Sequence, residues 1–147
     1  MKKQDYERAR QEFKKDLEVE PDVAFTYAEL ANVESTLQHE EEAAKNYRLA
    51  LKLDPRLVSA HMGLAKIEER RRNYRVALAE LDAVVRLDSG NASARYLRGQ
   101  VLMRLGREKE GRAELANATK MLNQQRAARQ KELEGQAPSP ELAREPQ

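Results

Sequence analysis

Hydrophobic residues recur along the chain at helical spacing, with charged residues between them. In the first such stretch Tyr6, Ala9, Phe13 and Leu17 lie three or four positions apart, which places them on one side of a helix. Pro21 lacks a backbone donor and clashes with the preceding turn, so this helix must end before it. The same pattern continues along the chain and predicts helices over residues 3–19, 23–37, 40–53, 58–71, 74–88, 91–105 and 107–134.

The pattern repeats after 34 residues. Pro21 and Pro55 are separated by this step, and so are two series of small residues: Ala9, Ala43, Ala77 and Gly111, and Ala31, Ala65 and Gly99. A period near 34 is typical of stacked two-helix units, which present a surface instead of enclosing an active site. We therefore expect an all-α chain whose function is to hold other proteins.

The two ends depart from the period. No helix precedes the first one to complete its unit, and Asn123, one step beyond the third unit, has neither proline nor glycine beside it. We expect the last helix to continue past Asn123, with or without a bend, as a polar cap. The predicted organisation is a half repeat (1–21), three repeats (22–55, 56–89 and 90–123), a helical cap (124–135) and a flexible tail (136–147).

These repeats resemble the tetratricopeptide repeat, a helix-turn-helix unit of 34 residues with small residues where its two helices cross. Several positions keep the step together: Leu30 and Leu64, Ala31 and Ala65, Ala43 and Ala77, Tyr47 and Leu81, and Leu53 and Leu87. The resemblance covers about residues 4–123 and implies a right-handed superhelical array. One departure lies in the turns, where Gln38 and Arg72 replace the glycine that Gly106 supplies.

In this family the first helices of successive units line a concave wall that binds a peptide or a partner helix. Matched by register, the resemblance implies a wall of Phe25, Ala28, Glu29, Asn32, Ser59, Met62, Gly63, Lys66, Ser93, Tyr96, Leu97 and Gln100. Phe25, Met62 and Tyr96 are the expected apolar anchors. One branch of the family holds the terminal carboxylate of chaperone tails with lysine and arginine. Ala28, Met62, Gly63 and Leu97 occupy most of those positions here, so we do not expect that ligand.

Gly63 lies inside a predicted helix, where glycine costs about 1 kcal/mol relative to alanine. Two interpretations explain it. Glycine leaves room beside Met62 for a ligand side chain, or it allows a neighbouring helix to pack closely. Packing is the simpler interpretation.

Composition excludes several other functions. The chain has no cysteine and two histidines, so it cannot form a disulfide or a thiolate site, and no nucleophile has a base beside it. We expect no enzyme activity, no cofactor and no metal site. No stretch approaches 18 consecutive apolar residues, so no membrane insertion is expected. A chain without cysteine is compatible with more than one cellular compartment.

Two alternatives to peptide binding remain at this point. The first helix lacks its usual companion, so Tyr6, Phe13 and Leu17 form an apolar stripe that a second copy could cover. Basic edges at residues 70–72 and 126–131 could attract nucleic acid, but the net charge is only +2 and Glu68 and Glu69 adjoin the first edge. Nucleic-acid binding is therefore not expected.

Overall fold

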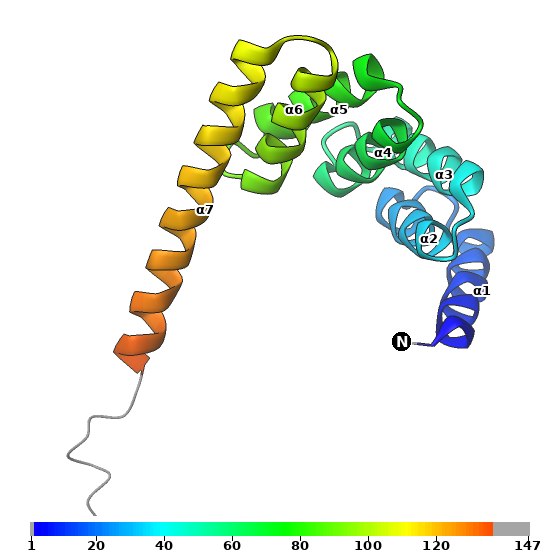
Figure 1. The fold of residues 1–147 in the computed structure, drawn as a ribbon. Coiled ribbons are helices and arrows are strands. Elements are labelled where there is room, and N and C mark those ends of the chain that lie inside the picture. Colours follow the sequence, from blue (N-terminus) through cyan, green and yellow to red (C-terminus); the bar gives the residue numbers. More distant parts are fainter. Residues whose placement is uncertain (1, 137–147) are drawn as a thin grey trace, which may run out of the picture.

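The computed structural model describes residues 2–136 as an arch of helices joined by short turns, with no strand among these residues (Figure 1). The all-α prediction is confirmed, and every predicted helix is present within two residues of its expected bounds. Most of the predicted tail lies outside the described residues, but Gln136 belongs to the last helix. The helices are α1 (Lys3–Val19), α2 (Ala24–Thr36), α3 (Glu40–Leu53), α4 (Val58–Arg70), α5 (Tyr74–Leu87), α6 (Ala92–Arg104) and α7 (Glu108–Gln136).

The core lies between consecutive helices, because each helix packs on the next one and α2 also touches α4. Small residues stand at these contacts, and Ala31, Ala43, Ala65 and Ala77 are all completely buried. Two apolar clusters result, one spanning α2 to α4 and one spanning α4 to α6. The arch therefore has a linear core in which each unit is stabilised by its neighbours.

The last helix continues without interruption from Glu108 through Asn123 to Gln136. Only Gly111 and Ala118 are buried along it, and Figure 1 shows its second half projecting away from the arch. Within this half, Gln125 Nε2 donates a hydrogen bond to the Gly90 carbonyl at 3.1 Å. The projecting half is almost entirely exposed.

The three turns within the units share one backbone geometry. Gln38, Arg72 and Gly106, spaced 34 residues apart, have φ of 64°, 63° and 78°. In each turn the following amide donates to the carbonyl five residues earlier: His39 to Glu34, Asn73 to Glu68 and Arg107 to Leu102, at 2.8 to 2.9 Å. This bond closes the end of a helix around a left-handed residue. Glycine adopts that conformation freely, whereas other residues are strained in it.

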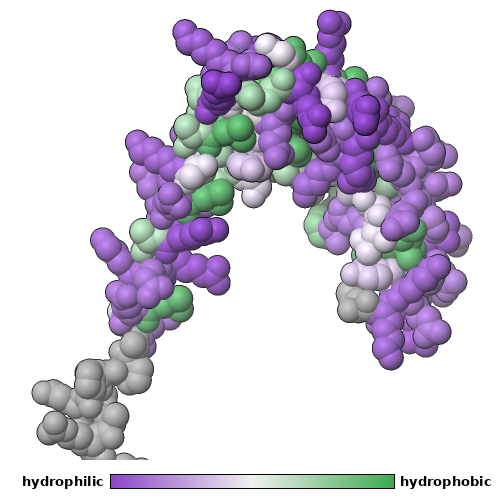
Figure 2. All heavy atoms as spheres, viewed as in Figure 1, coloured by the Kyte–Doolittle hydropathy of each residue, from purple (hydrophilic) through white to green (hydrophobic). Residues whose placement is uncertain are grey.

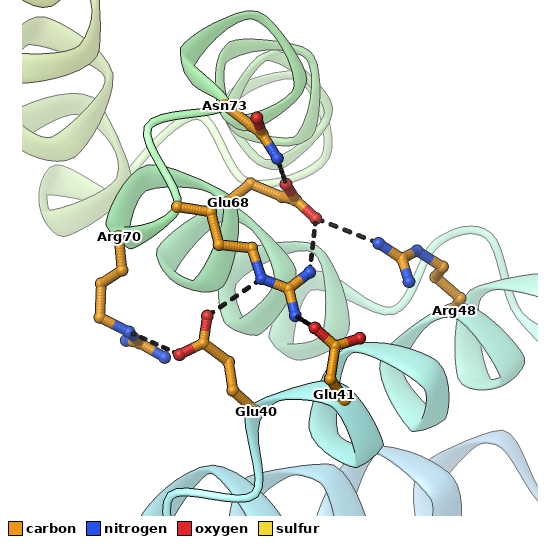
Figure 3. Close-up of polar contacts among 7 residues, drawn as sticks. Glu40, Glu41, Arg48, Glu68, Arg70 and Asn73 are labelled. Carbon is orange, nitrogen blue, oxygen red and sulfur yellow. Dashed lines mark hydrogen bonds and ion pairs between the residues drawn. The ribbon is translucent and has the colours of Figure 1, made fainter.

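Two buried carboxylates join neighbouring units. Glu34 and Glu68, 34 residues apart, are 1% and 3% exposed. Glu34 Oε1 accepts from Arg10 Nε of α1 at 2.8 Å, and its Oε2 lies 2.6 Å from His39 Nδ1. Glu68 accepts from Arg48 of α3 at 3.1 Å and from Asn73 at 2.7 Å (Figure 3). Each carboxylate thus ties the first helix of a unit to the second helix of the preceding unit.

The environment of Glu34 favours its charged form. Burial by itself would raise its pKa, but the hydrogen bonds and charges of Arg10 and His39 outweigh burial and hold the pKa below its usual value of 4.5. The position corresponding to Glu34 and Glu68 in the third unit is Leu102, which is fully buried. The third seam between units therefore has no buried carboxylate among the described residues.

We predict that Arg72→Gly stabilises the array by about 0.5–1 kcal/mol. Relief of left-handed strain is worth about 1–2 kcal/mol, and the greater backbone entropy of glycine in the unfolded chain offsets part of it. Urea denaturation measures the free energy of unfolding. Gly106→Ala is the reciprocal variant and should lower it by about 1 kcal/mol. A destabilised Arg72→Gly protein would contradict this explanation of the turns.

We also predict that the free energy of unfolding falls as the pH drops below about 4.5. The pKa of Glu34 is depressed in the folded state, so its contribution is complete above the unfolded pKa and is lost as the pH falls through the folded pKa. Glu34→Gln should cost on the order of 1–2 kcal/mol at pH 7 and reduce this dependence. Glu12→Gln, whose partner Lys15 is exposed at 3.5 Å, should retain the wild-type pH profile.

Candidate functional site

A groove of about 540 Å³ lies where α2, α4 and the start of α6 face the hollow of the arch (Figure 1). Figure 2 shows that hydrophilic side chains cover most of the visible surface, while hydrophobic residues form small patches, several of them along the inner edge. The groove is lined mainly by hydroxyl, amide and cationic side chains. Its residues are Asn32, Ser35, Thr36, Tyr47, Ser59, Met62, Gly63, Lys66, Arg70, Asn91 and Ser93.

The structure brings half of the twelve sequence-predicted wall residues into this groove: Asn32, Ser59, Met62, Gly63, Lys66 and Ser93. The other six lie elsewhere. Ala28 is fully buried in the core, so its side chain cannot contact a ligand, and Leu97 packs against the α4 to α6 cluster. Glu29 is half-buried and accepts a hydrogen bond from Asn32. Phe25, Tyr96 and Gln100 are exposed beyond the residues that line the groove.

Tyr47 of α3 reaches through the wall and forms part of the groove. Its hydroxyl donates to Asn32 Oδ1 at 2.5 Å, and Asn32 Nδ2 donates to Glu29 Oε1 at 3.2 Å. Burial, together with the nearby Glu29 charge, raises the pKa of Tyr47 to about 12. The phenol therefore stays protonated at neutral pH and remains a hydrogen-bond donor that fixes the Asn32 side chain.

The Tyr47 ring also accounts for Gly63. A Cβ atom at position 63 would lie 2.2 Å from Tyr47 Cζ and 2.5 Å from Tyr47 Oη, which is far inside van der Waals contact. The space beside Gly63 is thus filled by the protein itself. This contact supports close helix packing, and not an open space for a ligand, as the reason for glycine at this position.

The arginine-rich end of α4 is largely compensated by carboxylates. Arg71 Nε lies 3.1 Å from Glu40 Oε1, its Nη2 lies 2.6 Å from Glu41 Oε1, and its Nη1 lies 3.6 Å from Glu68 Oε1. Arg70 approaches Glu40 only at 3.9 Å (Figure 3). Sequence reasoning anticipated compensation by neighbouring glutamates but missed Glu40 and Glu41, which α3 brings to this turn from 30 residues away.

The possible self-association residues lie on α1, where no side chain is fully buried. Tyr6, Phe13 and Leu17 are each half-buried. Tyr6 lines a separate hollow of about 390 Å³ together with Lys3, Thr36, Leu37 and Gln38. Tyr6 therefore lies close to the end of α2 and to the groove.

Both histidines serve local structure. His61 Nδ1 lies 2.6 Å from Glu80 Oε2, and its Nε2 lies 2.7 Å from the Pro55 carbonyl, while His39 contacts Glu34. Residues 2–136 contain no group of three side chains that could hold a metal ion. Among the same residues, no helix is both long enough and apolar enough to cross a membrane.

Comparison with known proteins gives matches in sequence and in fold. The family model described as the tetratricopeptide repeat matches residues 28–90 and 65–131. The fold is similar to that of MamA, at a TM-score of 0.74 and 14% identity, over 80% of this chain and 69% of that one. MamA from Desulfovibrio magneticus RS-1 has a TM-score of 0.74 and 22% identity, over 79% of this chain and 66% of that one.

A further similar structure is YrrB, described as a TPR protein with an unusual peptide-binding site. It has a TM-score of 0.70 and 27% identity over 74% of this chain, which spans only 56% of the YrrB chain. No curated protein sequence matches this chain significantly.

We predict that Gly63→Ala lowers the free energy of unfolding by about 1–3 kcal/mol, although alanine is the better helix former. The added methyl group would overlap the Tyr47 ring and force the two helices to shift. Thermal and urea denaturation measure the effect. Gly90→Ala is the matched control, because a Cβ there would meet only Asp88 Oδ1 at 3.9 Å.

A double-mutant cycle tests whether Tyr47 is the cause. Leu81 lies at the position equivalent to Tyr47 in the next unit, so we expect the fold to accept Tyr47→Leu. In that background Gly63→Ala should cost much less than in the wild type. Equal costs in both backgrounds would show that another contact requires the glycine.

Proposed function

The chain belongs to the tetratricopeptide repeat family, and from this premise we propose that it is a non-catalytic scaffold that binds a peptide or a partner helix of another protein on the concave side of its array. The main support is the groove itself. It lies on α2, α4 and the start of α6 and offers amide, hydroxyl and cationic groups to a ligand backbone. The similar protein YrrB, a TPR protein with a peptide-binding site, is a precedent for this use of the fold.

Three large side chains are suited to anchor the ligand. Met62 lies in the groove on α4. Phe25 on α2 and Tyr96 on α6 are 61% and 44% exposed, so they stand free on the helices to either side. Aromatic residues and methionine are common anchors at interfaces because they contribute much apolar contact area. A ligand lying across the three helices would be able to contact all three.

The polar residues fit the backbone of such a ligand. Asn32 and Lys66 lie in the groove, and Gln100 is exposed on α6. Amide side chains can pair with both the N–H and the carbonyl groups of an extended peptide. Because the wall consists of only three first helices, the buried area would be small. We therefore propose an affinity on the order of micromolar, equivalent to about −8 kcal/mol.

We predict that replacing Phe25, Met62 and Tyr96 together by alanine weakens binding at least ten-fold. Ligands would first be selected from a displayed library of random peptides, using the wild-type chain as bait. Isothermal titration calorimetry then compares the wild type with the triple variant. Alanine at Val19, Leu53 and Val76, which are exposed apolar residues on α1, α3 and α5, the second helices of their units, is the matched control.

Circular dichroism would establish that both triple variants keep the helical fold. The single substitution Met62→Glu places a charge in the middle of the groove and should be sufficient to weaken binding. Unchanged affinity in the Phe25, Met62 and Tyr96 variant would show that ligands bind elsewhere. Failure to select any peptide would contradict the proposed function.

A further inference from the structure

Three hollows adjoin one another along the inner side of the array. Besides the groove, a hollow of about 510 Å³ is lined by Ser35, Gln38, Glu40 and Arg70, and the hollow beside Tyr6 measures about 390 Å³. Each pair of hollows shares lining residues. The groove shares Ser35 and Arg70 with the 510 Å³ hollow and Thr36 with the hollow beside Tyr6, and these two hollows share Gln38. Together they form a continuous track from α1 across α2 and α4 to the start of α6. We refer to these three hollows as the track.

The track is positively charged. Its lining residues include the cations Lys3, Lys66 and Arg70 and a single carboxylate, Glu40. Lys66 makes no ion pair with any described residue, and Arg70 approaches Glu40 only at 3.9 Å. The chain as a whole has nearly equal numbers of acidic and basic residues. The positive charge of the track therefore comes from the local arrangement of acidic and basic side chains and not from an overall excess of basic residues.

The charge arrangement around the track depends on Arg71, the residue next to Arg70. Arg71 forms ion pairs with Glu40 at 3.1 Å and with Glu41 at 2.6 Å. Glu68 accepts hydrogen bonds from Arg48 and Asn73. These three carboxylates are thus engaged by residues outside the track. Glu29 of α2 accepts a hydrogen bond from Asn32, Arg70 keeps only the 3.9 Å approach to Glu40, and Lys66 has no ion pair among the described residues.

We propose that the track binds an extended acidic peptide segment of a partner protein, with two carboxylates facing Lys66 and Arg70 and an apolar side chain beside Tyr6. This inference rests on the proposed function and specifies its ligand. Lys66 and Arg70 are one helical turn apart, so their Cβ atoms are separated by about 5–6 Å. Alternate side chains of an extended peptide lie about 6.5–7 Å apart on one side. The spacing fits acidic residues at alternate positions.

The polar groups between the cations suit the backbone of that segment. Ser35, Ser59, Asn91 and Ser93 line the groove at intervals on three elements and can donate to or accept from peptide groups. Neither Lys66 nor Arg70 requires a terminal carboxylate, so an internal acidic segment fits as well as a chain end. Tyr6 and Leu37 supply the apolar contact at the far end of the track.

Three synthetic peptides test the inference directly. Each has nine residues, a blocked C-terminus and one leucine near an end, and they alternate serine with glutamate, glutamine or lysine. Fluorescence anisotropy at 50 mM salt should show the glutamate peptide binding at least ten-fold more tightly than the glutamine peptide. Its affinity should fall between 50 and 300 mM salt, because screening weakens exposed charge pairs.

Charge-neutral variants locate the contact. Lys66→Gln and Arg70→Gln should each weaken the glutamate peptide about three-fold, as expected for one exposed ion pair, and the double variant about ten-fold. Lys45→Gln and Arg86→Gln remove exposed cations of α3 and α5 outside the track, and should leave the affinity unchanged.

Two results would overturn the inference: equal binding of the glutamate and glutamine peptides, or wild-type affinity in the Lys66 and Arg70 double variant. Library-selected peptides that bind in the groove without acidic residues would refute this inference and leave the proposed function standing. If neither selected nor acidic peptides bind, both proposals fail.

Discussion

Each unit of this protein can bury its apolar side only against its neighbours, so the close approach of consecutive helices governs everything else. That approach depends on small residues at a fixed step. Alanine fills the crossings of the first two full units, and at the third a Cβ on Gly99 would lie 3.1 Å from the Gly111 carbonyl oxygen. Larger side chains there would separate the helices and open the core. The distance between neighbouring helices also sets the shape of the groove, because the groove is lined by α2, α4 and the start of α6.

The close packing also explains why the groove is polar. Tyr47 fills the space above Gly63 and orients Asn32 through its hydroxyl group. The apolar residues of the units are used at the crossings, which leaves hydroxyl, amide and cationic side chains to face the hollow of the arch. A ligand would therefore meet a preorganised surface, and preorganisation reduces the entropy lost on binding.

Sequence reasoning succeeded where local chemistry decides the structure. Pro21 and Pro55 follow the ends of α1 and α3, and Gly106 adopts the left-handed turn. It did not anticipate that Gln38 and Arg72 adopt the same turn, because the closing hydrogen bond imposes it on any residue there. Glu34 and Glu68 were missed because their arginine partners lie 24 and 20 residues away. Ala28 was assigned to the wall by register, yet its short side chain ends inside the core.

Leu102 stands where the first two full units have a buried glutamate, so the contacts between units differ in chemistry along the array. At each of the first two seams a buried glutamate pairs with an arginine of the preceding helix, whereas at the third seam Leu102 is buried and the ion pair between Arg98 and Asp82 is more exposed. In an array stabilised by nearest neighbours, seams of different chemistry respond to different conditions. Because the pKa of Glu34 is depressed in the folded state, acid should weaken the seam where α1 meets α2, so protonation acts unevenly along this nearly periodic chain.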